Sequence, residues 1–219
     1  MTSAGSQQSP QQEPIKPSVT QPVTQSAAGR PRIVLASASP RRLDLLRQIG
    51  LEPDLIDPPH TDEMTRRGEL PRDYAKRVAL EKLRVAQQRH PGAVVIAADT
   101  VVACGRRILP KAEDAATARR CLQLLSGRRH CVLGGIALGL PDGGSAFRLV
   151  STKVMMKRLE TAEIDRYIAE GDWQGKAGGY AIQGRAAIFV REISGSYSNV
   201  VGLSLSDLAA MLQGHGIQF

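Results

Sequence analysis

Two adjacent arginines, Arg41 and Arg42, stand where an α-helix disfavours positive charge. In the segment ASASPRR, Ser39 is the expected N-cap and Pro40 the expected first helical residue, which puts both arginines in the first turn. That turn carries partial positive charge and free N–H groups. We therefore expect an anion beside these arginines, and phosphate is an anion that helix N-termini commonly bind.

A lysine and an aspartate also break the pattern of the elements that carry them. In a helix predicted over residues 71–89, Lys82 falls in the middle of the apolar face. Its ammonium either extends past small side chains to solvent or meets a phosphate or carboxylate. Asp99 follows the apolar run 93–98, interpreted as a buried strand that ends there. Open α/β sheets bind ligands at such ends, whereas a surface turn is the alternative for Asp99. Because several local rules fail together, we expect a shared functional site.

The remaining polar groups complete a set suited to phosphoryl chemistry. Asp62 and Glu63 form an acidic pair in a loop without apolar periodicity. Taken alone they would be solvated, but beside the residues above they supply oxygen ligands for Mg²⁺ or Mn²⁺ and leave the cations for phosphate oxygens. Ser37 and Ser39 have no base linked to them in the sequence, so phosphate binding or capping is favoured over a nucleophilic role.

Gln183 is the strongest candidate for recognising a base. The dipeptide Gln183-Gly184 puts an amide beside a residue that lets a ligand approach the backbone closely. An amide both donates and accepts, so it can match the edge of uracil or thymine. By spacing alone, Lys111 and Lys176 cannot be distinguished from ordinary exposed lysines.

Composition narrows the class of protein. The formal net charge of +8 indicates an acidic partner, which could be nucleic acid, an anionic surface or a small phosphorylated ligand. Aromatic residues make up only 4% of the chain and do not interleave with the basic ones, which argues against a base-stacking platform for single-stranded nucleic acid. No apolar run is long enough to cross a membrane. Three cysteines without a C-x-x-C pair predict neither a disulfide framework nor a zinc site, and a reducing cytoplasm is expected.

The order of elements predicts an α/β fold. Residues 1–30, rich in Gln, Pro, Ser and Thr, are expected to be a disordered tail, and residues 31–219 a single domain. Beyond the segments above, we expect a helix over 114–126 that ends at Gly127 and a hairpin of strands 130–140 and 146–158. Further along, Thr161 is expected to cap a helix ending at Gly171, before a strand over 187–191 and a helix over 204–213.

With these residues in place, the chain from Arg32 to about Leu212 closely resembles the Maf family of nucleoside triphosphate pyrophosphatases. The matching motifs occur in order along the chain: ASASPRR, DE, LEK, AADT, the lysine of LPK, LSGRRH, KAGGYAIQG and GSYSNVVGL. The resemblance implies a mixed, twisted sheet with flanking helices and a deep cleft, like that of inosine triphosphate pyrophosphatases. It also implies hydrolysis of a nucleoside triphosphate to the monophosphate and pyrophosphate, with a divalent metal, Mg²⁺ or Mn²⁺.

The resemblance further implies substrates and roles for particular residues. Arg41, Lys82 and Gln183 match the trio of the subgroup similar to dTTP/UTP pyrophosphatases, and modified pyrimidine nucleotides are plausible substrates. The hypothesis for the mechanism is that a metal held by Glu63 and Asp99 bridges phosphate oxygens. One of these carboxylates, with Asp99 preferred, activates the attacking water. Lys82 and Gln183 would contact phosphate or base. The remaining hydroxyl and cationic groups would hold the triphosphate: Ser37, Ser39, Arg41, Arg42 and Lys111. Homodimers are common in the family.

Two other functions compete with this reading. The first is a non-catalytic regulator of cell division that binds nucleotide or nucleic acid, because the Maf name is tied to septum formation. The set of Glu63, Lys82, Asp99 and Lys111 disfavours it, since pure binding of an anion needs no carboxylates. The second is a phosphohydrolase acting on phosphate esters, which would release orthophosphate instead of pyrophosphate.

Overall fold

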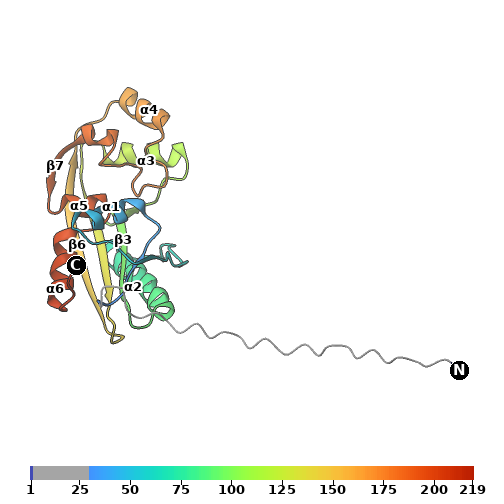
Figure 1. Cartoon of the computed structure of the whole chain (residues 1–219). Coiled ribbons are helices and arrows are strands. Elements are labelled where there is room, and N and C mark those ends of the chain that lie inside the picture. The colour runs from blue at the N-terminus through green and yellow to red at the C-terminus, as the bar shows by residue number, and fades with distance from the viewer. Residues whose placement is uncertain (2–29) are drawn as a thin grey trace.

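The computed structural model describes residue 1 and residues 30–219, so the predicted tail lies almost wholly outside the described residues. One mixed sheet forms the centre, with the order β2-β1-β3-β5-β6-β7 and with β4 paired to β3 (Figure 1). The strands are β1 Ile33–Ala36, β2 Leu55–Ile56, β3 Val94–Cys104, β4 Arg107–Leu109, β5 Arg129–Gly139, β6 Ser145–Met156 and β7 Val190–Ser194. The helices are α1 Pro40–Gln48, α2 Pro71–Arg89, α3 Ala115–Leu125, α4 Thr161–Glu170, α5 Tyr197–Val201 and α6 Leu205–Gly214, with a 3₁₀ helix over Arg185–Phe189.

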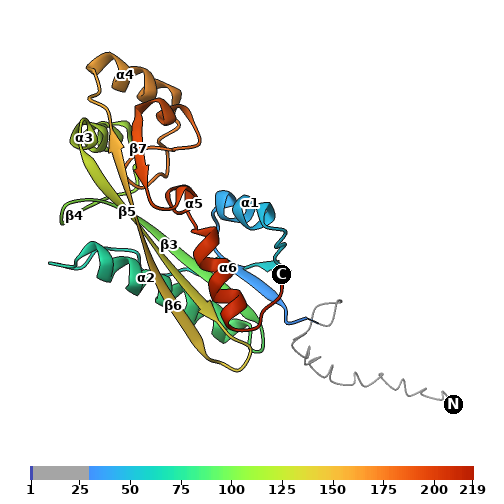
Figure 2. The same cartoon turned by 90° about the vertical axis from the view of Figure 1, so that its left-hand side faces the viewer.

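Helices cover both faces of this sheet. Figure 2 shows α2 on one face of the long strands β3, β5 and β6, with α1, α5 and α6 on the other, while α3 and α4 lie at one end beside β7. The small residues Ala75, Ala79 and Ala86 of α2 are fully buried in the α2 layer. The opposite layer has a larger core built on leucines and aromatics such as Leu46, Leu122 and Tyr167. The predicted α/β class with a mixed, flanked sheet is confirmed.

The arrangement of β1 and β3 opens the space that the site uses. β1 runs parallel to β3 and the two pair from Ile33 with Val94 to Ala36 with Ala97, after which β1 ends and the chain turns into α1. β3 continues, and β4 pairs with it only from Val102 onward. Within the described residues, the edge of β3 between these two pairings has no neighbouring strand on this side.

The predicted end of a strand at Asp99 is therefore wrong, because β3 continues through it and pairs with β5 at Gly135. β5 supplies hydrogen bonds on the other edge throughout, so one polar residue does not end the strand. Asp99 nevertheless lines a cavity, which lies at the carboxyl end of β1 rather than of β3.

Most of the other predicted elements are confirmed, with two corrections in the last third. α2 has the predicted bounds, and the hairpin and the helices before and after it match within a few residues. The expected strand over 187–191 is instead a 3₁₀ helix followed by β7. α4 is capped by Glu160, whose capping box with Glu163 puts Thr161 at the first helical position. None of the helices in residues 30–219 combines the length and apolar character needed to span a membrane.

Candidate active site

A cavity of about 490 Å³ opens where β1 stops pairing with β3. Its walls come from the turn between β1 and α1, the middle of β3, the loop after β2, the segment 174–183 and the end of α5. Of the residues predicted for the site, Asp62 does not line this cavity, and the others all do: Ser37, Ser39, Arg41, Arg42, Glu63, Lys82, Asp99, Lys111 and Gln183.

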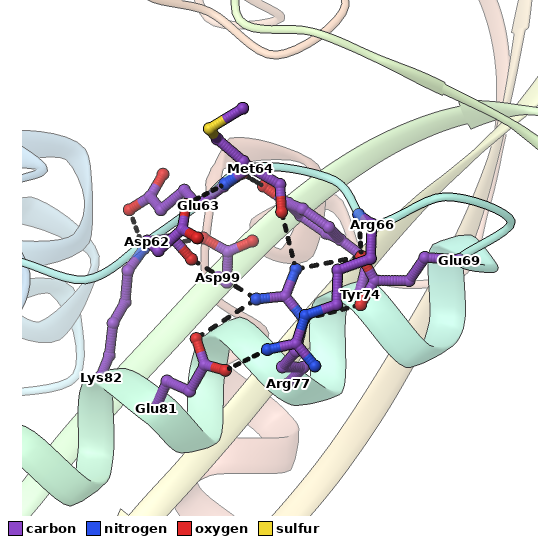
Figure 3. A network of polar contacts seen from close by, with 10 residues as sticks. All are labelled: Asp62, Glu63, Met64, Arg66, Glu69, Tyr74, Arg77, Glu81, Lys82 and Asp99. Atoms are coloured by element: carbon purple, nitrogen blue, oxygen red, sulfur yellow. Dashed lines mark hydrogen bonds and ion pairs between the residues drawn. The ribbon is translucent and has the colours of Figure 1, made fainter.

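Four of these residues form a chain of ion pairs. The Lys82 Nζ lies 2.8 Å from Asp99 Oδ1 and 2.7 Å from Glu63 Oε1, and the Lys111 Nζ lies 2.5 Å from Glu63 Oε2. Figure 3 shows Lys82 extending from α2 toward the two carboxylates. Lys82 and Asp99 are only 8% and 4% exposed, so the ammonium on the apolar face of α2 meets a partner instead of reaching solvent.

Glu63 is held in its charged form by the two lysines. Partial burial pushes its pKa up, but the hydrogen bonds from Lys111 and Lys82 outweigh that effect and lower the pKa to about 2. Glu63 is therefore a carboxylate at any pH near neutrality. Its neighbour Asp62 does not line the cavity; its carboxylate accepts a hydrogen bond from the Met64 N–H at 2.9 Å and so stabilises the loop.

Arg42 uses most of its hydrogen-bond donors in contacts with other residues of the chain. It is buried, and it donates to Ser37 Oγ at 2.7 Å, to Thr100 Oγ1 at 3.1 Å and to the Gly202 carbonyl at 2.9 Å. These bonds use three of the five guanidinium N–H groups and tie the turn after β1 to β3 and to the end of α5. Burial lowers the pKa of Arg42, an effect partly offset by the negative charge of Asp99.

Arg41 also lines the cavity, and it makes fewer hydrogen bonds to the described residues than Arg42 does. Its Nε donates to the Val201 carbonyl at 3.3 Å, and partial burial lowers its pKa. Ser39 is the N-cap of α1, as predicted, but its side chain makes no capping hydrogen bond. The hydroxyl of Ser39 and the guanidinium of Arg41 are thus available, beside the start of α1, for the anion that the sequence predicts.

The cavity is lined by one more cation, Lys176, which spacing alone does not single out. Its Nζ donates to the Gln174 carbonyl at 3.0 Å. Partial burial, and next the positive charge of Arg41, lower the pKa of Lys176. Two cations that repel each other in one cavity favour the binding of an anion beside them. Only the backbone path joining 174–178 to 110–112 brings Lys176 here, and no short-range pattern shows that path.

Other lining residues were also missed from the sequence. Thr100, beside Asp99, accepts from Arg42 and donates to the Gly202 carbonyl at 3.2 Å. The Tyr180 hydroxyl lies 2.8 Å from Nε2 of the buried His130. Burial lowers the pKa of His130 to about 4, so its imidazole is neutral near pH 7 and supports the wall through this hydrogen bond.

The donor set fits a metal that arrives with a phosphorylated ligand. In residues 30–219 no group of three or more His, Cys, Asp or Glu side chains is arranged to hold a metal. Glu63 and Asp99 are two carboxylates that lie 2.7 and 2.8 Å from one lysine nitrogen, that of Lys82. Mg²⁺ is commonly bound by one or two carboxylates completed by substrate phosphates and water, which this pair satisfies.

Comparison with known proteins identifies the family. The model of the Maf family, described as Maf-like protein, matches residues 32–215. A dTTP/UTP pyrophosphatase of Paramagnetospirillum magneticum is 64% identical over 84% of this chain and 97% of its own length. A dTTP/UTP pyrophosphatase of Caulobacter vibrioides is 59% identical over 87% of this chain and 98% of its own length.

Two solved structures are also similar. A nucleoside-triphosphatase / dITP/XTP pyrophosphatase from Mycobacterium abscessus is 21% identical, with a TM-score of 0.43, over 84% of this chain and 94% of its own. A HAM1 protein from Coxiella burnetii is 19% identical, with a TM-score of 0.46, over 83% and 98% of the two chains. The family match over most of the chain, together with relatives of such high identity, carries the assignment: the chain belongs to the Maf family.

Proposed function

We propose that this chain hydrolyses dTTP and UTP to the nucleoside monophosphate and pyrophosphate. The observation that carries the proposal is the chain of ion pairs Lys111–Glu63–Lys82–Asp99 in one cavity with the start of α1. Relatives named dTTP/UTP pyrophosphatase, 64% and 59% identical over nearly their whole length, support the substrate. Modified pyrimidine nucleotides are further candidate substrates, and residues 31–219 would form the catalytic domain.

In this proposal Asp99 is the general base. Its Oδ1 accepts from Lys82 at 2.8 Å, and no hydrogen bond of Oδ2 to another described residue is found, so Oδ2 can accept a proton from water. The water oxygen bonds to the α-phosphorus, the bond from that phosphorus to the bridging oxygen breaks, and pyrophosphate leaves. Lys111 and Lys82 offset the negative charge that the triphosphate brings.

A divalent metal, Mg²⁺ or Mn²⁺, would be held by Glu63 and Asp99 together with phosphate oxygens of the substrate. When bound, it would supply electrostatic stabilisation of the charge that develops on the phosphates. Arg41, Ser39 and Lys176 would hold the rest of the triphosphate. We also propose a cytoplasmic enzyme that acts without a membrane or a nucleic acid; a homodimer remains a prediction.

Gln183 is proposed to select the base. Its side chain is exposed to the cavity, and its amide has no hydrogen-bond partner among residues 30–219. The amide can therefore satisfy both the carbonyl and the N–H of a uracil or thymine edge. A carboxylate there would only accept, so Gln183→Glu should lower kcat/KM for UTP about tenfold, the cost of a lost hydrogen bond and an unpaired carbonyl.

The experiment is a panel of nucleoside triphosphates with Mg²⁺ or Mn²⁺, in which pyrophosphate and monophosphate are both measured. Selective turnover of dTTP and UTP with equal amounts of the two products supports the proposal. Release of orthophosphate instead of pyrophosphate would contradict the proposal and indicate a phosphohydrolase of another class. Folded protein that turns over no nucleotide but binds RNA or DNA with a steep salt dependence would indicate the nucleic-acid-binding regulator.

A further inference from the structure

The loop that carries Glu63 makes few hydrogen bonds within itself, among them those from the Met64 N–H to Asp62 and from the Arg66 N–H to Glu69. Residues 57–70 connect β2 to α2 without a helix or strand. Among the described residues, the one hydrogen bond between backbone groups within 58–69 joins the Glu69 N–H to the Arg66 carbonyl at 3.1 Å. Irregular loops of this length in compact domains are commonly functional, and their position must be fixed from outside.

Two side chains of α2 supply that support. The Tyr74 hydroxyl donates to the Glu63 carbonyl at 2.7 Å. The Arg77 guanidinium donates to the Met64 carbonyl at 2.9 Å and to the Asp62 carbonyl at 3.4 Å. Three successive carbonyls, centred on Glu63, are thus bound from residues one helical turn apart. Figure 3 shows this loop lying across α2 with Arg77 beneath it.

Arg77 is itself fixed by two carboxylates. Its Nε and one terminal nitrogen bind Glu69 at 2.7 and 3.0 Å, and the other terminal nitrogen binds Glu81 at 3.2 Å. The side chains of Arg77 and Glu69 are only 12% and 8% exposed. A guanidinium that binds a carboxylate through two nitrogens and is nearly buried has one preferred orientation, whereas an exposed ion pair has several.

One helix therefore holds both ends of Glu63: Tyr74 and Arg77 bind its backbone and the backbone beside it, and Lys82 binds its carboxylate. We propose that Tyr74 and Arg77 are positioning residues, which set the place of the Glu63 carboxylate relative to Lys82, Lys111 and Asp99. This inference rests on the proposed function. It adds that α2 orders the loop before nucleotide binds, so that no binding energy is spent on bringing Glu63 into place.

The test uses Tyr74→Phe, which removes one hydroxyl, and Arg77→Lys, which keeps a charge for Glu69 but loses the fork. Arg89→Lys is the matched control, because Arg89 lies on the same helix and pairs with Asp57 at the surface. We expect kcat for UTP to fall about tenfold in Tyr74→Phe and about a hundredfold in Arg77→Lys, since a misplacement of about 1 Å can cost that much. The control should stay within about twofold of the unsubstituted protein.

A double-mutant cycle with Glu63→Gln separates positioning from general loss of structure. If Tyr74 and Arg77 act through the Glu63 carboxylate, the same substitutions should lower the residual rate by less than about twofold in the Glu63→Gln background. Equal losses in both backgrounds would overturn the proposal, as would an unchanged kcat in the presence of Glu63.

A second readout needs no turnover and so distinguishes failure of this inference from failure of the proposed function. Amide hydrogen exchange over residues 62–69 should be at least about tenfold faster in Tyr74→Phe and Arg77→Lys than in Arg89→Lys, with exchange in β3 unchanged. Unchanged exchange in the loop overturns the inference whatever the activity. Faster exchange in a protein that hydrolyses no nucleotide would leave the ordering of the loop standing and reject the proposed function.

Discussion

Two sets of residues that line the cavity differ in how their charges are matched. In the first set, which we call the paired side, Glu63, Lys82, Asp99 and Lys111 neutralise one another through three close contacts. The second set, which we call the open side, consists of Arg41, Lys176 and Gln183. The hydrogen bonds that Arg41 and Lys176 make within the described residues go to backbone carbonyls.

This difference indicates that the two sides have different roles, one in the reaction and the other in binding. Groups that are already paired keep their positions when a ligand arrives, so the residues of the paired side are suited to act on the reacting atoms of a substrate. Cations without a counter-ion are stabilised most when an anion binds, so the residues of the open side are suited to binding the substrate. Substitutions on the paired side should therefore lower kcat, and those on the open side should raise KM.

The largest effect is expected on the paired side, from Asp99→Asn. The amide keeps the shape of the side chain and an oxygen for Lys82 but cannot accept a proton from water, so kcat for UTP should fall about a thousandfold. KM should change by less than about threefold. Asp165→Asn, at an exposed ion pair with Arg119, is the control. A folded Asp99→Asn protein with undiminished kcat would exclude the role of Asp99 as base.

Lys176→Gln tests the open side. Removing a charged hydrogen-bond donor to phosphate should raise KM about tenfold and leave kcat within about twofold. Lys153→Gln, at an exposed lysine of β6, serves as the control for the loss of one positive charge. A loss in kcat with KM unchanged would place Lys176 with the reacting groups and remove the distinction between the two sides.

On each side of the cavity the local pattern of the sequence predicts some residues and misses one lysine, Lys111 on the paired side and Lys176 on the open side. Lys82 and Asp99 stand out because each puts a charge in an apolar segment, and burial of charge is visible in a local pattern. Lys176 lies in a glycine-rich segment with no periodicity, so nothing local distinguishes it. Its place depends on the pairing of 174–178 with 110–112, a contact between distant parts of the chain.

The same distinction applies to the fold. α2 was predicted with its observed bounds because its apolar face repeats over five turns and Pro71 marks its start. β2 and β4 are too short to show a pattern, and β3 continues beyond Asp99 because β5 supplies its hydrogen bonds. The strand predicted over 187–191 overlaps the 3₁₀ helix Arg185–Phe189 because the apolar residues there fit both structures.

The smallest effect that separates the two sides is the dependence of KM on alkaline pH. Partial burial and the charge of Arg41 lower the pKa of Lys176, so it loses its proton at a lower pH than an ordinary lysine. As pH rises through that pKa the open side loses a cation while the phosphates stay fully charged, so KM should rise about two- to threefold, and at a lower pH than titration of an ordinary lysine would require. Glu63, with its pKa near 2, stays a carboxylate over the whole range and should contribute nothing to this change. Lys176→Arg keeps its charge and should hold KM constant. The same rise in KM in Lys176→Arg would assign it to another group and leave the open side without a titrating cation.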